Sequence, residues 1–200
     1  MTTDLEKIQK KLEKKLKKER YQHTLGVMYT AGSLAMRYNE NLEEALTAGL
    51  LHDCGKYCAV KDQIKLCQKH HIQLTPAELE TPALIHAKLG AYLAEKKYGI
   101  ENPRVLDAIR YHTTGRPHMS MMDKIIYLAD YIEPNRKIIP GLAMIRQLSF
   151  TNIEQAVCQC ANSTLKYLEK SRRFIDPMTQ QTYEYYKNNN DQIKKETKGE

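Results

Sequence analysis

Repeated helix-start signals constrain the fold of this 200-residue chain more than any other feature. They stand at Thr75-Pro76-Ala77-Glu78, Thr81-Pro82, Asn102-Pro103, Ser120-Met121-Met122-Asp123, Thr151-Asn152-Ile153-Glu154 and Asp176-Pro177. The first side chain of such a signal accepts hydrogen bonds from the free N–H groups of a helix start, and proline fits the first turn. No stretch shows the sustained apolar–polar alternation or the Asn-Gly turn of a β-hairpin. The sequence therefore predicts an all-α domain of about eight to ten helices, given a mean helix length of ~11 residues.

Several polar side chains fall on the apolar faces of these predicted helices. Val27 follows His23 by one turn, so we expect His23 to open an amphipathic helix and to share its buried face. His112 follows Ile109 in the same way and should point inward at the end of its helix. A single histidine on an apolar face is more often a hydrogen-bonded core residue than a ligand. The joint placement of several such residues favours a common site.

A histidine and an aspartate are adjacent at the end of the helix predicted over residues 43–51, in Leu50-Leu51-His52-Asp53-Cys54-Gly55-Lys56. Such a pair supplies two metal ligands of different charge. His23 upstream and Asp130, which lies beside an apolar helix face, complete a shell of two imidazoles and two carboxylates. This mixed N/O shell suits iron, manganese, cobalt or zinc and leaves positions for water and a phosphate oxygen. We expect Gly55 to end the segment by letting the backbone turn freely.

Cationic side chains lie near these predicted ligands in the sequence. Lys56 follows Asp53 by three residues and emerges on the metal side if the turn continues helically, where its ammonium group would neutralise phosphate charge. An exposed surface lysine is the equal alternative. Arg20 has the same two interpretations. Arg136 and Arg173 are further candidates for phosphate contact, with surface ion pairing as the alternative.

The formal net charge of +7 would permit nucleic-acid binding, but much of the excess lies near the two ends of the chain. Residues 1–18 form a predicted basic amphipathic leader helix whose apolar residues recur at helical spacing. A packed helix explains this pattern better than a nucleic-acid arm. Residues 19–187 then form one predicted catalytic domain, and residues 188–200 a polar tail that we expect to fray.

The chain has no apolar run near the ~18 residues that a membrane span requires, and its basic start lacks the apolar segment of a signal peptide. Its five cysteines are an odd number without CxxC spacing, which argues against a disulfide framework and a zinc ribbon. We therefore predict a cytoplasmic protein without membrane contact.

The order His23, His52-Asp53, Asp130 on a helical scaffold resembles the HD-domain metal phosphohydrolase superfamily. Longer motifs resemble one branch of it, the bacterial symmetrical diadenosine tetraphosphatases, also called symmetrical bis(5'-nucleosyl)-tetraphosphatases. These motifs are His23-Thr24, Leu51-His52-Asp53-Cys54-Gly55-Lys56, Ile85-His86-Ala87, Tyr111-His112-Thr113-Thr114-Gly115 and Ala129-Asp130-Tyr131-Ile132-Glu133-Pro134-Asn135-Arg136. The likeness runs from about residue 20 to about residue 177.

This resemblance implies an HD-domain helical bundle that hydrolyses diadenosine tetraphosphate (Ap4A) to two ADP. It implies iron as the cofactor, held by His23, His52, Asp53 and Asp130. The catalytic residues would be Asp53, Lys56, His86 and His112. Contacts to the dinucleoside polyphosphate would come from Arg20, His23, Lys56, His86, His112, Thr113, Asp130, Arg136 and Arg173. We expect one firmly held ion and leave open a second one at the two later histidines.

Other functions are compatible with the same residues. Another HD phosphohydrolase would cleave deoxynucleoside triphosphates, nucleoside monophosphates or cyclic dinucleotides with the same metal shell. A regulatory module would bind ADP or a related nucleotide without turnover. Nucleic-acid binding through the leader is a third alternative, and its affinity would fall steeply with salt. The oligomeric state is open, with a homodimer among the options.

Overall fold

The computed structural model describes the backbone of residues 4–196 and the side chains of residues 4–190. Within this range the chain forms eleven α-helices and two 3-10 turns, and no strand. The helices are α1 (Leu5–Lys15), α2 (Lys18–Arg37), α3 (Leu42–Leu51), α4 (Val60–Lys69), α5 (Pro76–Glu80), α6 (Ile85–Tyr98), α7 (Pro103–Tyr111), α8 (Met121–Ile132), α9 (Leu142–Thr151), α10 (Ile153–Lys170) and α11 (Pro177–Glu196). The turns are η1 (Cys54–Tyr57) and η2 (Pro82–Leu84). The all-α prediction is confirmed, and the count exceeds the predicted range because α5 is only five residues long.

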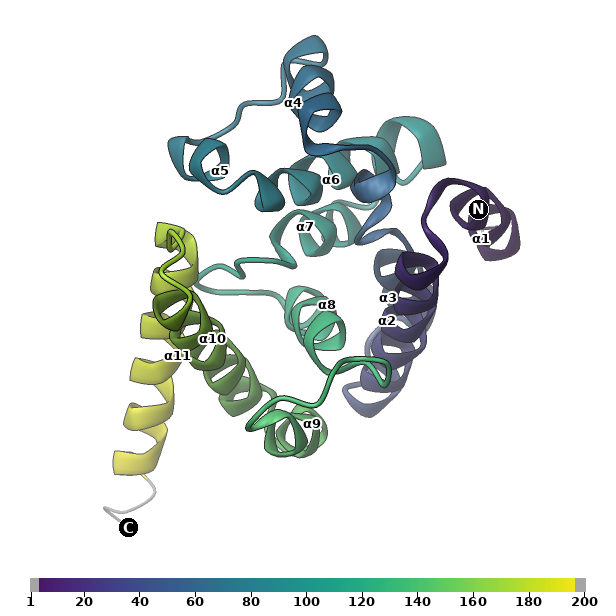
Figure 1. The fold of residues 1–200 in the computed structure, drawn as a ribbon. Helices are drawn as coiled ribbons and strands as arrows, with labels where there is room; N and C mark the ends of the chain where they lie inside the picture. The colour runs from purple at the N-terminus through teal and green to yellow at the C-terminus, as the bar shows by residue number, and fades with distance from the viewer. Residues whose placement is uncertain (1–3, 197–200) are drawn as a thin grey trace.

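Helix α8 lies at the centre of the molecule, with α2 and α3 on one side, α7 above it and the α10–α11 pair on the other side (Figure 1). Its apolar residues are almost fully buried: Met122, Ile125, Ile126, Leu128 and Ala129. Helix α6 packs on α7 and η1, and α4 and α5 lie at the outer end of the same layer (Figure 1). This arrangement brings the ends of α3, α7 and α8 close to the start of α6.

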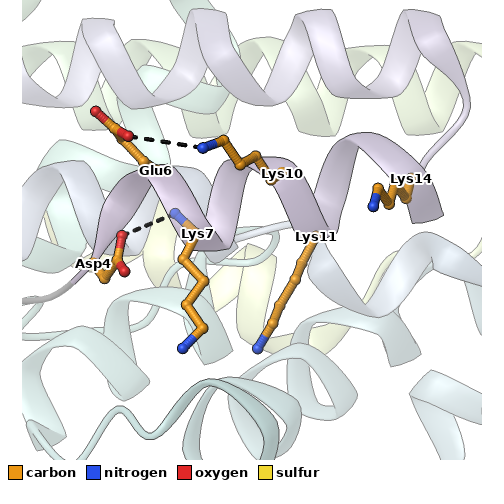
Figure 2. Close-up of a pocket in the computed structure, with 6 residues that line it drawn as sticks. All are labelled: Asp4, Glu6, Lys7, Lys10, Lys11 and Lys14. Atoms are coloured by element: carbon orange, nitrogen blue, oxygen red, sulfur yellow. Dashed lines mark hydrogen bonds and ion pairs between the residues drawn. The ribbon is translucent and has the colours of Figure 1, made fainter.

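The leader helix α1 packs on the body through the predicted apolar stripe. Ile8, Leu12 and Leu16 are buried and belong to the same hydrophobic core as the rest of the chain. The lysines of α1 lie on its exposed side, where Lys10 and Glu6 approach to 4.0 Å (Figure 2). None of the described helices combines the length and the apolar character needed to cross a bilayer.

One expectation about a helix start is wrong. Helix α2 begins at Lys18, so His23 lies in its second turn and does not open it; extended backbone at Leu16 and Lys17 sets this boundary. Helix α11 continues through Glu196, so the predicted polar tail begins as helix, and its fraying stays a prediction. The boundary at residue 188 stays a prediction, and residues 1–3 and 197–200 of the predicted leader and tail lie outside the described residues.

Gly55 has a different role from the one expected, because it permits a close approach between η1 and α6. A Cβ atom at Gly55 would lie 2.4 Å from the carbonyl oxygen of His86 and 3.1 Å from the amide nitrogen of Gly90. Both neighbours are backbone atoms of α6, which cannot move away as a side chain would. The glycine therefore holds the Asp53–Lys56 segment directly against the start of α6.

We expect Gly55→Ala to lower the free energy of unfolding by about 1–3 kcal/mol, the usual range for overpacking. Gly90→Ala is the matched control, because a Cβ atom at that position would meet its nearest neighbour at an ordinary 3.4 Å. Urea denaturation of both variants measures the difference. Equal stability of the two variants would contradict this account of Gly55.

Candidate metal centre

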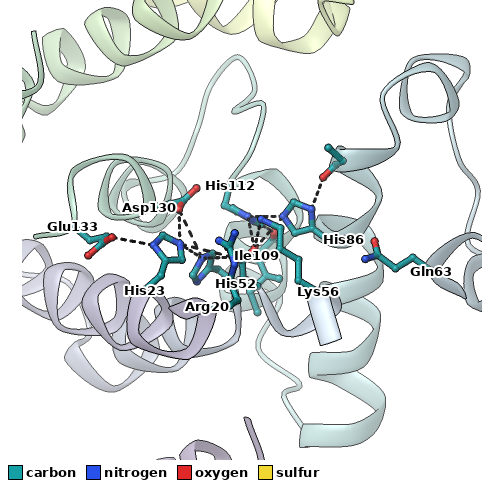
Figure 3. A network of polar contacts seen from close by, with 12 residues as sticks. Arg20, His23, His52, Lys56, Gln63, His86, Ile109, His112, Asp130 and Glu133 are labelled. Carbon is teal, nitrogen blue, oxygen red and sulfur yellow. Dashed lines mark hydrogen bonds and ion pairs between the residues drawn. The ribbon is translucent and has the colours of Figure 1, made fainter. Parts of the chain in front are cut away.

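Four imidazoles and two carboxylates converge where α2, α3, α6, α7 and α8 meet (Figure 3). They are His23, His52, Asp53, His86, His112 and Asp130. Helix ends supply most of them: His52 follows the last residue of α3, and His112 follows the last residue of α7. His86 is the second residue of α6, and Asp130 lies in the last turn of α8. The fold thus brings together the residues that the sequence singled out, although they are spread over more than 100 positions of the chain.

One half of the centre contains the four predicted metal ligands. His23 Nε2 lies 3.0 Å from Asp130 Oδ1, and His52 Nε2 lies 3.4 Å from Asp53 Oδ2. The crossed distances, from His23 to Asp53 Oδ2 and from His52 to Asp130 Oδ1, are both 3.8 Å. One cation between these four atoms would contact all of them after small side-chain movements.

The other half of the centre consists of His86 and His112, which face the second carboxylate oxygen of Asp53. Asp53 Oδ1 is 3.2 Å from His86 Nε2 and 3.7 Å from His112 Nε2. Asp53 is therefore placed between two pairs of imidazoles, with one oxygen toward each pair. Its side chain is only 1% exposed, so these imidazoles, together with the side chains of Arg20 and Lys56, surround it.

The hydrogen bonds of the rings turn their free nitrogens toward the centre. Three histidines lie with Nδ1 close to the carbonyl oxygen three residues earlier: His52 to Gly49 at 2.7 Å, His86 to Ala83 at 2.6 Å and His112 to Ile109 at 2.7 Å. A carbonyl oxygen accepts, so Nδ1 carries the proton and Nε2 keeps its lone pair.

The Nε2 atoms then face one another in pairs. The His23–His52 pair is separated by 3.3 Å and the His86–His112 pair by 3.1 Å. Two lone pairs at this distance repel each other unless a cation lies near them. Neutral imidazoles with oriented Nδ1–H groups are the usual form of histidine metal ligands. The residues present therefore fit a divalent ion.

Burial and polar neighbours shift the pKa values of these groups. Burial acts to raise the pKa of Asp53, but the surrounding imidazoles outweigh it and hold that pKa well below its ordinary range. Asp130 also titrates with a lowered pKa, because His23 and Arg136 outweigh the effect of burial. Burial lowers the pKa of His86 to about 4. Two carboxylates are thus ionised and His86 is neutral at pH 7, which is the state that metal binding requires.

Three of the predicted phosphate-binding cations line the solvent side of the centre. Arg20 Nη1 lies 2.8 Å from Asp53 Oδ2, and Lys56 Nζ lies 2.9 Å from Asp53 Oδ1. Arg136 donates from Nε to the carbonyl oxygen of Asp130 at 2.7 Å. Their side chains are between 31% and 39% exposed, whereas the carboxylate of Asp53 is buried. These cations therefore border the opening of the centre.

Two other predicted substrate contacts lie away from the ion-pair cluster. Arg173 is exposed in the loop after α10, where its guanidinium group lies 5.6 Å from the centre of the Tyr167 ring. Thr113 follows His112 and lines a cavity of about 510 Å³ together with Tyr111 and Phe174. Phe174 is the neighbour of Arg173 in sequence, so the same loop reaches this cavity.

Glu133 is a part of the centre that the sequence did not single out. Its side chain is 1% exposed, and its Oε1 lies 3.1 Å from His23 Nδ1 (Figure 3). The sequence contains two signals for it: Glu133 lies one turn after Asp130 at the end of the same helix, and it belongs to the 129–136 motif that carries the family resemblance. Neither signal reveals a partner 110 positions away.

Comparisons with known proteins agree with this geometry. The HD domain family model matches residues 20–135. The chain is 39% identical to the "Bis(5'-nucleosyl)-tetraphosphatase, symmetrical" of Bacillus subtilis, over 87% of this chain and 92% of that protein. It is 40% identical to the protein of the same description from Halalkalibacterium halodurans, over 84% of this chain and 89% of that protein. A solved structure from Clostridium acetobutylicum, described as a predicted HD superfamily hydrolase involved in NAD metabolism, is 38% identical with a TM-score of 0.88, covering 92% of this chain and 97% of that one.

Proposed function

Because this chain belongs to the HD-domain family, we propose that it hydrolyses Ap4A symmetrically to two molecules of ADP. The observation that supports this most directly is the joint presence of His/Asp groups that could hold a metal ion and near full-length likeness to symmetrical tetraphosphatases. The enzyme is thus an acid anhydride hydrolase, and its substrate class is the dinucleoside tetraphosphates.

The ion would be held by His23, His52, Asp53 and Asp130, and we propose iron, with manganese, cobalt or zinc as alternatives. A divalent ion supplies charge neutralisation and lowers the pKa of a bound water toward neutrality. The carboxylate of Asp53 also reaches the His86–His112 pair, so the donor set leaves room for a second ion there. One firmly held ion is the form that we propose.

The chain's own cations provide the phosphate contacts. Arg20, Lys56 and Arg136 border the opening, and each donates from its charged end to a carboxylate oxygen, of Asp53 for the first two and of Asp130 for Arg136, which it can exchange for a phosphate oxygen. Catalysis of phosphoryl transfer rests mainly on positioning and on the relief of developing charge. These three side chains would bind and neutralise the polyphosphate while Asp53 orients the attacking water.

The remaining proposed contacts extend from the phosphates toward a nucleoside. His86 and His112 lie on the far side of Asp53 from His23, beside the carboxylate oxygen that Lys56 contacts. Thr113 follows His112 in the chain and lines the cavity of about 510 Å³, which Phe174 also lines. An aromatic ring in the wall of this cavity suits an adenine base, and Arg173, next to Phe174 in the chain, would contact the ribose or a phosphate.

The position of the cut tests the proposal. If the centre holds the inner phosphates, water attacks an inner phosphorus and ADP is the only nucleotide released. Hydrolysis in water labelled with heavy oxygen should place one label on the terminal phosphate of one ADP in each pair. Chromatography and mass spectrometry of the products measure both outcomes. Release of AMP and ATP would replace this assignment by a broader phosphohydrolase activity.

The proposal also covers the cellular location of the enzyme and its oligomeric state. All five cysteines are free thiols, as in proteins of a reducing cytoplasm, where we place the enzyme. A homodimer stays a prediction, which light scattering of the purified protein would test.

A further inference from the structure

The four histidines of the centre differ in what holds their Nδ1–H groups. His52, His86 and His112 lie at helix ends and use a main-chain carbonyl oxygen three residues earlier. His23 lies inside the long helix α2, and its Nδ1 meets the carboxylate of Glu133 at 3.1 Å. His23 is therefore the member of the set whose partner carries a full negative charge.

Glu133 is held in place by other contacts. Its Oε2 accepts a hydrogen bond from the backbone N–H of Asn135 at 2.7 Å. Its main-chain carbonyl oxygen accepts from Arg146 Nη2 at 3.0 Å. In the part of the chain whose side chains are described, His23 is the group that forms an ion pair with this carboxylate. The charge of Glu133 is thus directed at one imidazole.

The sequence of α2 makes room for this carboxylate. Gly26 lies one turn after His23, and a Cβ atom there would be 2.4 Å from Glu133 Oε2. Glycine inside an α-helix is unfavourable by roughly 0.5–1 kcal/mol relative to alanine. Helix stability therefore does not explain a glycine at this position. The absence of a side chain at Gly26 leaves space that the carboxylate of Glu133 occupies.

We propose that Glu133 is a positioning residue that fixes the tautomer of His23 and makes the His23–His52–Asp130 half of the centre the tighter metal site. A carboxylate partner raises the basicity of a ligating imidazole, and its removal typically weakens metal affinity 10- to 100-fold. The His86–His112 half has main-chain partners only, so it lacks this contribution. The proposal rests on the metal centre of the proposed function and gives a physical basis for the single firmly held ion that is proposed there.

Glu133→Gln tests the proposal, because it keeps the shape of the side chain and removes its charge. The metal-free variant is titrated with manganese, and then with zinc, in competition with a chelator. We expect the affinity for the first ion to fall about 10- to 100-fold. Glu154→Gln is the control, since Glu154 pairs with Lys124 in a different part of the fold and should leave the affinity unchanged. An affinity of Glu133→Gln equal to that of the unmodified protein would overturn the proposal.

A second variant separates positioning from general damage to the fold. Gly26→Ala improves helix propensity but places a methyl group against Glu133, so we expect weaker metal binding without loss of helix content. In a Glu133→Ala background the closest obstacle is gone and the nearest remaining neighbour is the side-chain nitrogen of Asn135 at 3.2 Å, so the same change should have little further effect. Additive losses in this cycle would show that Gly26 acts independently of Glu133 and would contradict the proposal.

These titrations contain no nucleotide, so their outcome is independent of the reaction. If the unmodified protein fails to cleave Ap4A while the affinity differences appear, the proposed function falls and the role of Glu133 stands. If Ap4A is cleaved to ADP and the affinities do not differ, the inference on Glu133 falls alone.

Discussion

Replacing Asp53 by asparagine is expected to remove both tightly bound metal and Ap4A hydrolysis. The amide has the same shape but no charge, and no neighbouring side chain reaches both imidazole pairs as Asp53 does. Metal ligands of this kind must be deprotonated and anionic to offset the charge of the ion. We expect metal content far below one ion per chain and a fall in kcat/KM of more than 1,000-fold, or about 4 kcal/mol of transition-state stabilisation.

The measurement combines metal analysis after anaerobic purification with the rate of ADP release. Asp107→Asn is a suitable control, because Asp107 lies on α7 and, among the described side chains, forms its ion pairs with the exposed Arg110 and the partly buried Arg116 and with no residue of the centre. This control should keep its metal and its activity. A folded Asp53→Asn protein with stoichiometric metal and near-normal turnover would refute the site.

Several helix starts were predictable because a side chain caps the first turn. Thr75, Asn102 and Ser120 accept a backbone N–H as their positions in the sequence predict. At the signal of residues 151–154 the cap is Asn152, one residue after the predicted Thr151, which is the last residue of α9. Helices α4 and α9 gave no such signal, because Ala59 and Gly141 precede them and form no side-chain cap. Their amphipathic packing, which depends on the rest of the fold, determines where they form.

The Thr81-Pro82 signal was only partly correct. It begins the short turn η2, and α6 starts three residues later at Ile85. Proline fits the first turn of either kind of helix, so the local sequence does not distinguish them. The close approach of η1 to α6 at Gly55 could not be predicted either. It depends on how two separate segments pack, and the local sequence around Gly55 does not indicate its partner.

The meeting of these side chains in one centre could be predicted because the chemistry of each is visible in its own segment, while their role as metal ligands stays a prediction. A histidine or aspartate on an apolar helix face needs a partner, and His23, His112 and Asp130 share this property. Glu133 escaped notice because its partner lies on another helix and only the packing of α2 against α8 joins them. Arg173 remains a prediction, since its role depends on a substrate that would reach from the centre to the loop after α10.

Lys56→Met is expected to leave the metal in place and to lower kcat/KM for Ap4A by on the order of 100-fold. Lys56 Nζ lies 2.9 Å from Asp53 Oδ1 while its side chain is 31% exposed, so it can contact the ion's carboxylate ligand and a phosphate together. Removing one group that stabilises developing negative charge typically costs about 2.7–4 kcal/mol of the barrier. Methionine keeps most of the aliphatic stem, so the loss reports on the ammonium group.

The control for this variant is Lys61→Met, because Lys61 is an exposed lysine of α4. Steady-state kinetics with Ap4A and metal analysis of both variants separate two roles of Lys56. If the metal is retained and turnover falls, the ammonium group acts on the phosphates. If the metal is lost as well, the main contribution of Lys56 is to hold Asp53 in place. Its ammonium group would then act by compensating the negative charge of this buried carboxylate. Unchanged kinetics and metal content would assign Lys56 to the protein surface and would leave Arg20 and Arg136 as the phosphate contacts at the opening.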